Sequence, residues 1–179
     1  MTTVGFAAEQ AEFTTNSLPV PDHGSICFKA PKGWSFLKKG AVNPFGPRSA
    51  EFRSEDGLIS VQATFFWDGF GPKQMKPSEK DLADLTEKSG KAQFLSGSVE
   101  KKVVLENFKG AEASGCFARF TDADWVGKKP PAGEFANVTT GMVRCGDLWG
   151  NFTILTNEKD GPSFKQALVV IETLQKAKP

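Results

Sequence analysis

The stretch Ala50–Trp67, AEFRSEDGLISVQATFFW, holds a turn signal between two runs of alternating apolar residues. Asp56-Gly57 is typical of a tight β-hairpin, because glycine adopts the positive φ that such turns need. Folding the chain at this point sets Phe52 opposite Val61, and their apolar neighbours then fall on one face. The pattern predicts an antiparallel pair with one side in a core. The two predicted strands are residues 49–54 and 58–67.

A second turn signal, Gly146-Asp147, predicts another hairpin that sets Arg144 opposite Trp149. Two further strand-like runs flank the turn region at residues 108–110. An earlier short run ends at Pro31, since proline lacks the amide that a strand needs. These predicted strands cover residues 135–145, 148–156, 99–107, 111–121 and 25–30.

Two segments predict helices that cover the sheet. Pro77 and Ser78 are typical of a helix start, and one apolar face continues from there until Gly90. The second helix opens at Gly161-Pro162-Ser163, with Ser163 and Gln166 in the spacing of a capping box. Its apolar residues recur at helical intervals and predict a stripe against the sheet. This stripe consists of Phe164, Ala167, Leu168, Ile171 and Leu174.

The composition favours one globular domain with a core of its own. Of 179 residues, 39% are hydrophobic, and 22 basic side chains nearly balance 21 acidic ones. The small net charge therefore gives no long-range electrostatic attraction to nucleic acid or to an anionic membrane. Protein or small-molecule partners are expected. No apolar run approaches the roughly 20 residues that a transmembrane helix needs. We expect a flexible N-terminal segment over residues 1–23 and a single α+β domain over 24–179.

The N-terminal residues and the cysteines bear on the compartment. Residues 1–9, MTTVGFAAE, resemble the small-residue end of a secretory signal peptide, although a frayed alanine-rich terminus explains them equally well. The first interpretation places the protein in the periplasm or outside the cell, and the second leaves it cytoplasmic. The cysteines are Cys27, Cys116 and Cys145, an odd number without metal-ligand spacing. In an exported protein one disulfide and one free thiol are expected, and otherwise three small buried residues.

The tryptophans are the residues that could serve either packing or binding. Trp34 follows the turn at Gly33 and is expected to fold back over the sheet edge as architecture. Trp67 shares a face with the predicted core. Trp149 lies beside Arg144, where a cation–π pair would stabilise the sheet. Trp125 has no periodic partner and stands in the polar loop TDADWVGKKPPAGE, so it is the best candidate for contact with a partner.

The search for catalytic chemistry finds little. His23 is the single histidine, and we expect it to face solvent in a loop, with no partners identified for a catalytic triad. No glycine-rich phosphate loop is present, so no nucleotide cofactor is expected. Asp122, Asp124 and Glu134 could supply oxygen ligands to a hard cation, but they lack the calcium-loop pattern and are read as solvated charges. We therefore predict no catalytic, cofactor or metal site.

Several motifs together resemble the Mog1/PsbP-like group over roughly residues 24–176. They are the strand-Pro-x-Gly-Trp signature in FKAPKGWSF, the hairpin after it, the SEKDLADL helix, the pair VVLENFKGAEASGCFARF and the closing helix SFKQALVVIETL. The resemblance implies an α+β fold in which an antiparallel meander is flanked by helices as an α/β/α sandwich. Members of this group resemble non-enzymatic accessory and binding proteins. No residue that binds a photosystem or a GTPase can be matched in this chain, so neither role carries over.

Two hypotheses of function follow from these observations. The first is a non-catalytic binding or accessory protein, expected in a bacterial cell envelope, that acts through its sheet edge or the loop at 122–134. Its candidate partner-binding residues are Trp125, Asp122, Asp124, Lys128 and Lys129. The second is a metal-assisted hydrolase that uses the loop carboxylates, because paired carboxylates can do acid–base work without histidine.

Overall fold

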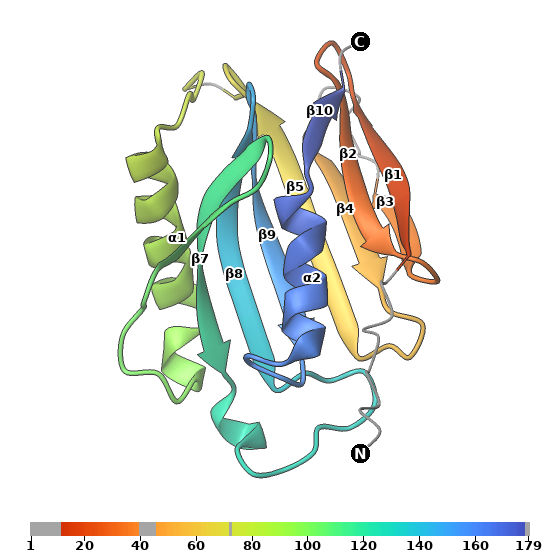
Figure 1. Cartoon of the computed structure of the whole chain (residues 1–179). Coiled ribbons are helices and arrows are strands. Elements are labelled where there is room, and N and C mark those ends of the chain that lie inside the picture. The colour runs from red at the N-terminus through yellow and green to blue at the C-terminus, as the bar shows by residue number, and fades with distance from the viewer. Residues whose placement is uncertain (1–11, 40–45, 72, 178–179) are drawn as a thin grey trace, which may run out of the picture.

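A seven-stranded antiparallel sheet forms the centre of the molecule in the computed structural model, which describes residues 12–39, 46–71 and 73–177 (Figure 1). Its strand order is β3-β4-β5-β9-β8-β7-β6. Two meanders, β3 to β5 and β6 to β9, meet where β9 pairs with β5. The strands are β3 (Ser35–Lys39), β4 (Arg48–Arg53), β5 (Ile59–Trp67), β6 (Glu106–Lys109), β7 (Ala113–Thr121), β8 (Asn137–Cys145) and β9 (Leu148–Thr156).

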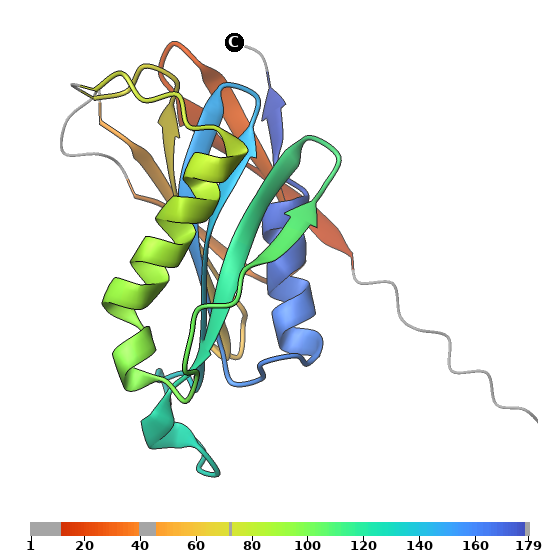
Figure 2. The same ribbon diagram turned by 90° about the vertical axis from the view of Figure 1, so that its left-hand side faces the viewer.

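Helices lie on both faces of this sheet, and a small second sheet shares one of those faces. Helix α1 (Glu79–Gln93) packs against β7 and β8, while α2 (Pro162–Glu172) packs against β2, β5 and β9. Figure 2 shows the two helices on opposite sides of the sheet. The second sheet has the order β1-β2-β10. Its strands are β1 (Phe13–Val20), β2 (Gly24–Pro31) and β10 (Gln175–Ala177).

Both predicted hairpins are confirmed in register. Phe52 lies opposite Val61 across β4 and β5, and Arg144 lies opposite Trp149 across β8 and β9. Gly57 and Gly146 hold φ values of +72° and +63°, which explains why glycine stands at both turns. The α+β class and the antiparallel sheet flanked by helices are therefore confirmed.

The main core lies between the large sheet and the layer of α2 and β2. Phe28 on β2 and Phe52 on β4 are both buried, with ring centroids 5.0 Å apart. Phe164 on α2 meets Phe117 on β7 edge to face at 5.9 Å. Alternation along each strand sends every second side chain into this core. The most deeply buried side chains include Ile26, Phe65, Phe152, Ile154, Ile171 and Leu174.

A second, smaller core lies between α1 and the opposite face of β7. The Ser78 hydroxyl and the Asp81 carboxylate form a capping box, so the predicted start of α1 is confirmed. The helix does not end at Gly90, as the sequence suggested, but continues to Gln93. Gly90 is instead buried against the ring of Phe120, because glycine leaves room for that ring.

The boundaries of several other helices and strands differ from the predicted ones. The N-terminal segment is not irregular up to residue 23, because residues 13–20 pair with β2 as strand β1. The predicted strand over 99–107 is wrong: β6 is only Glu106–Lys109, and the chain before it is irregular. Ser163 forms no capping box, since Gly161 is the N-cap of α2 and makes no side-chain cap bond. The possible signal-peptide remnant at residues 1–9 lies outside the described residues.

All three cysteines carry free thiols, so the disulfide expected for an exported chain is not formed. Cys116 is buried under α1, with its sulfur 3.3 Å from the Thr86 hydroxyl. Cys145 is buried at the end of β8, and Cys27 on β2 is half-buried. In the described part of the chain, neither helix is long and apolar enough to cross a membrane.

Candidate functional site

The loop between β7 and β8, residues 122–134, extends beyond the end of the sheet. Figures 1 and 2 show it as the lowest part of the molecule, clear of both helices. It opens with a short 3-10 turn, η2 (Ala123–Trp125), and most of its residues are exposed. The predicted exposed loop is therefore present, although its first residues are more regular than the sequence indicated.

Hydrogen bonds within the loop fix the conformation of its first half. The Asp122 carboxylate accepts a bond from the Asp124 amide at 2.9 Å, as expected of an aspartate before a helical turn. The Trp125 amide donates to the Asp122 carbonyl at 3.2 Å, and the Lys128 amide donates to the Trp125 carbonyl at 3.0 Å. The Lys128 ammonium also donates to the Asp124 carbonyl. These hydrogen bonds hold the backbone from which the side chains of the loop project.

The root of the loop is tied to the chain segment before β6. Ser98 forms an isolated antiparallel bridge with Asp122, and the Val99 amide donates to the Thr121 carbonyl at 3.0 Å. Glu100 accepts bonds from the Thr121 amide at 2.9 Å and from the Lys159 ammonium at 2.6 Å. Burial opposes the charge of Glu100, but these bonds prevail and lower its pKa to about 2.

The side chains on the loop combine apolar and basic surface. Trp125 is half-buried, so it is neither fully exposed nor part of the core. The next residue, Val126, is 55% exposed, and Val99 beside the loop root is 42% exposed. Lys128 and Lys129 are exposed on the following turn. Sequence reasoning missed both valines, since nothing in the sequence shows that residue 99 adjoins the loop.

The structure does not gather the loop carboxylates into a metal centre. Asp122 is engaged with the Asp124 amide, and Glu134 stands at the far end of the loop. Among the described residues, no three histidine, cysteine, aspartate or glutamate side chains are placed to hold an ion. The alternative of a metal-assisted hydrolase therefore finds no support in the arrangement of these three residues.

His23 is not the solvent-facing loop residue that the sequence suggested. Its ring stacks on Trp67 with centroids 5.1 Å apart, and its Nδ1 lies 3.1 Å from a carboxylate oxygen of Asp147. Lys176 on β10 binds the same carboxylate. Although burial alone would raise the pKa of Asp147, the bonds from Lys176 and His23 lower it. The histidine thus joins the β1–β2 turn to the β8–β9 turn, which is a structural role.

Trp149 and Arg144 also differ from the predicted pair. Trp149 is 7% exposed and stacks on Phe66 with centroids 4.8 Å apart. Arg144 binds Asp68 at 2.7 Å and the Pro77 carbonyl at 2.8 Å, which holds the segment between β5 and α1 against the sheet. The predicted role in stabilising the sheet stands, but it works through an ion pair and ring stacking. Trp34 and Trp67 are partly buried against the core, as expected.

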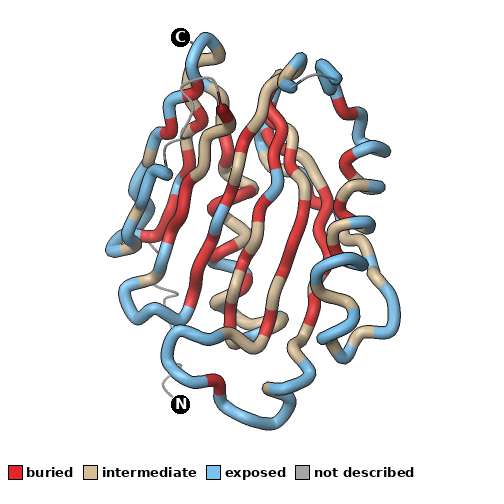
Figure 3. The backbone as a smooth tube through the Cα atoms, turned by 180° about the vertical axis from the view of Figure 1, so that it is seen from behind, coloured by how far each residue is buried: buried red, intermediate tan, exposed pale blue. Residues whose placement is uncertain are grey.

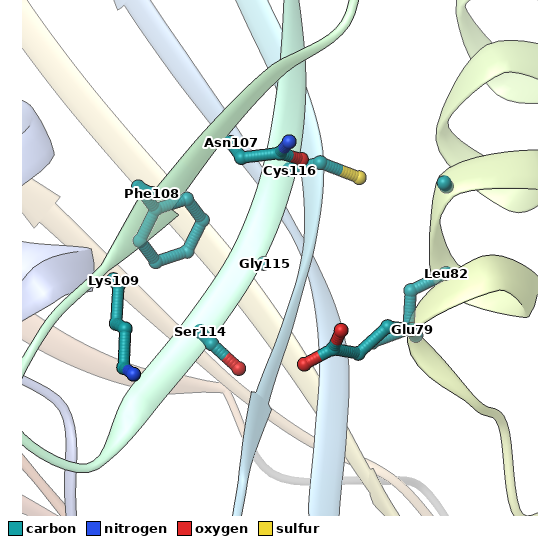
Figure 4. A pocket seen from close by; sticks show the side chains of 9 residues that line it. Glu79, Leu82, Asn107, Phe108, Lys109, Ser114, Gly115 and Cys116 are labelled. Carbon is teal, nitrogen blue, oxygen red and sulfur yellow. The ribbon is translucent and has the colours of Figure 1, made fainter.

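A cavity of about 360 Å³ lies between α1 and the β6–β7 hairpin. Figure 4 shows Glu79 reaching from the helix toward Ser114 on β7, with Lys109 and Asn107 on β6. Within the described residues, none of these four polar side chains forms a hydrogen bond or an ion pair. The volume lies in the range of small-ligand pockets, so this cavity is a second candidate site.

Comparison with known proteins adds a likeness of fold. No protein-family model matches the sequence, and no curated protein matches it either. Among solved structures, the chain is similar to the solution structure of cyanobacterial PsbP (CyanoP) from Synechocystis sp. PCC 6803. The similarity covers 99% of both chains at 12% sequence identity, with a TM-score of 0.49. At this identity and TM-score, the likeness carries no conclusion about the role of this chain.

Proposed function

We propose that this chain is a non-catalytic binding or accessory protein that contacts another protein through the loop at residues 122–134. The observation that carries the proposal is that this loop extends beyond the sheet with its backbone held by internal hydrogen bonds. It presents Trp125 and Val126 beside two exposed lysines. Protein interfaces are enriched in aromatic anchors surrounded by polar residues. A loop whose backbone is already fixed loses little further entropy on binding, which favours affinity.

In this proposal the residues of the loop play different parts. Trp125 and Val126 supply the apolar area that is removed from water. Lys128 and Lys129 supply positive charge at the rim, where charge mainly sets the association rate and the choice of partner. Asp122 acts indirectly, because its carboxylate holds the Asp124 amide and so fixes the turn that presents Trp125.

The test is capture of partner proteins from an extract of the native organism, using the whole chain as bait. We expect Trp125→Ala to weaken capture by about 30-fold, since truncating an interface anchor costs upward of about 2 kcal/mol. The matched control is Leu37→Ala, which removes an exposed apolar side chain on β3, the strand at the opposite edge of the sheet from β6 and β7. Thermal unfolding of each variant separates binding from folding. Intact capture combined with a large loss of stability would assign Trp125 to packing and end the proposal.

We also propose that the protein works in the bacterial cell envelope, in the periplasm or secreted. The support is the spacing of Gly5 and Ala7, which suits a signal-peptidase site. Fractionation of the native organism, followed by N-terminal sequencing of the mature chain, tests this location. A chain that retains Met1 in the cytoplasmic fraction would contradict it.

A small-ligand role for the cavity under α1 is the second candidate function. The observation in its favour is that Glu79 and Lys109 bring opposite charges to one cavity without partners of their own. A small zwitterion would satisfy both groups. Titration with free amino acids, compared between the wild type and Lys109→Ala, tests this role without involving the loop.

A further inference from the structure

One side of the large sheet is left without a covering helix over three of its strands. Helix α1 covers β7 and β8 on that side, and Figure 3 shows no described helix in front of β9, β5 and β4. Val61 and Ala63 on β5 point into the main core, so Gln62 and Thr64 point to the uncovered side. We call this surface the open face: the outward side of β4, β5 and β9 centred on Gln62, Thr64, Asn151 and Thr153.

The open face is rich in uncharged groups that form hydrogen bonds. Gln62 lies directly opposite Thr153, and Thr64 lies opposite Asn151, so amides and hydroxyls form two adjacent cross-strand pairs. Gln62 and Asn151 are exposed. Within the described residues, the side chains of Gln62, Asn151 and Thr153 form no hydrogen bond. Their donors and acceptors are therefore available to a ligand.

The one carboxylate beside this face is compensated by two cations. Glu51 on β4 lies between Lys39 and Arg53, at 2.5 Å from each. The hydrogen bond from Lys39, with that from Arg53, lowers the pKa of Glu51, so it remains ionised at neutral pH. A strongly basic ligand would thus find no uncompensated carboxylate here, and a polyanion would meet an excess of only one positive charge.

Two buried polar groups on the same side of the sheet lack partners. Ser60 is 2% exposed and Trp149 is 7% exposed, and the Ser60 hydroxyl and the Trp149 indole N–H have no hydrogen-bond partner among the described residues. By strand alternation Ser60 lies on the side of Gln62, and Trp149 lies on the side of Asn151. Both atoms are shielded from solvent, so they add to the polar character of this side of the sheet but would not contact a ligand on its surface.

An aromatic cluster borders one end of this polar surface. Phe66 is half-buried and stacks on Trp149, and Phe70 packs against Phe66 with centroids 5.2 Å apart. Aromatic faces carry partial negative charge and attract the C–H groups of a ligand that lies flat on them. A sugar ring carries hydroxyl groups at its edge and polarised C–H groups on its face. It would therefore match both the polar centre of the open face and its aromatic border.

We propose that the open face binds a neutral carbohydrate chain, with Gln62 and Asn151 hydrogen-bonding its hydroxyl groups and Phe66 contacting one sugar ring. The pattern combines exposed neutral amides and hydroxyls with a bordering aromatic ring. The buried core of a protein interface is more apolar than this surface, and a nucleic acid would be expected to meet a more basic one. This inference does not depend on the loop at 122–134, because the two surfaces share no residue.

The first experiment is calorimetric titration of the full chain with cellohexaose, maltohexaose and chitohexaose. We expect at least one of them to bind saturably with a Kd near or below about 1 mM. In the double variant Gln62→Ala/Asn151→Ala we expect this affinity to fall at least tenfold with an unchanged melting temperature, since both side chains are exposed. The matched control, Gln166→Ala, removes an exposed amide on α2, which lies on the other side of the sheet, and should bind as the wild type does.

A second measurement locates the ligand directly. The four tryptophans give four indole N–H signals in a nitrogen–proton correlation spectrum, and Trp149→Phe identifies the one of interest. Adding the bound hexaose should shift the Trp149 signal and leave the Trp125 signal in place. Absence of binding by all three hexaoses would overturn the proposal. So would affinity unchanged by the double variant, or binding of heparin in place of the neutral chains.

Discussion

Phe120 on β7 lies so close to Gly90 on α1 that a β-carbon added at Gly90 would stand 2.8 Å from the tip of the ring. Both residues are buried, so the ring has little room to move. Gly90→Ala should therefore destabilise the protein by about 1 kcal/mol. Overpacking costs about 1–3 kcal/mol, and the better helix propensity of alanine returns about 1 kcal/mol.

Denaturant unfolding measures this change, with Gly97→Ala as the matched control. An added β-carbon at Gly97 would meet nothing within 4 Å. The denaturant concentration at the unfolding midpoint of Gly97→Ala should stay close to that of the wild type. A more stable Gly90→Ala protein would show that the ring yields and that the close approach is unimportant.

Ile171 on α2 is fully buried in the main core, and its removal should be costly. Ile171→Ala is expected to lower the free energy of unfolding by about 2–5 kcal/mol, since the side chain leaves a cavity against the sheet. Chemical denaturation gives the value. Val169→Ala, on the same helix but only half-buried, should cost clearly less. Equal losses from the two variants would contradict the packing described for α2.

Glu100 should make stability depend on acidity. Its pKa is lowered from 4.5 to about 2 in the folded protein, so its contribution is complete above about pH 4.5 and is lost as the pH falls toward 2. At about 1.36 kcal/mol per unit, that contribution is at most about 3 kcal/mol. Glu100→Gln should therefore be less stable at pH 7, and its stability should approach that of the wild type near pH 2.

Unfolding curves at a series of pH values test this expectation. Glu134→Gln serves as the control, because that carboxylate is exposed and forms no side-chain bond within the described residues. Its profile should follow that of the wild type. A Glu100→Gln profile parallel to the wild type from pH 7 to pH 2 would refute the assignment.

The three thiols should differ sharply in reactivity. Burial, with the nearby charge of Glu112, raises the pKa of Cys145 to about 11, so only about one molecule in a thousand carries the reactive thiolate at pH 8. Cys116 is also buried, whereas Cys27 is half-buried. Iodoacetamide should label Cys27 first in the native protein and the other two only after unfolding. Mass spectrometry of the labelled peptides shows the order in which the thiols react. Early labelling of Cys145 would contradict the structure.

Local chemistry explains which parts of the fold could be predicted from sequence. The two hairpins were predictable because Asp56-Gly57 and Gly146-Asp147 fix both turn and register within a few residues. Strand β10 was not, because QKA carries no alternating pattern and is a strand only through its pairing with β2. Gly90 was misread as a helix end, since the sequence does not show that Phe120 packs against it.

The candidate sites divide in the same way. The loop at 122–134 could be located from its prolines, glycines and charges, which are local signals. Its contact with Val99 could not, because that depends on the bridge between Ser98 and Asp122. The open face could not be recognised either, since Gln62 and Asn151 become neighbours only through the pairing of β5 with β9.

The pairing of β5 with β9 also has a consequence for the order of folding events. The whole of α1, β6, β7 and β8 separates these two strands in the sequence, although they lie side by side in the sheet. Each meander can form early from neighbouring strands, but closing the long loop between them costs entropy before it gains contacts. The junction of β5 and β9 should therefore form late and limit the folding rate. Until it forms, each meander carries an unpaired edge that invites association with other chains.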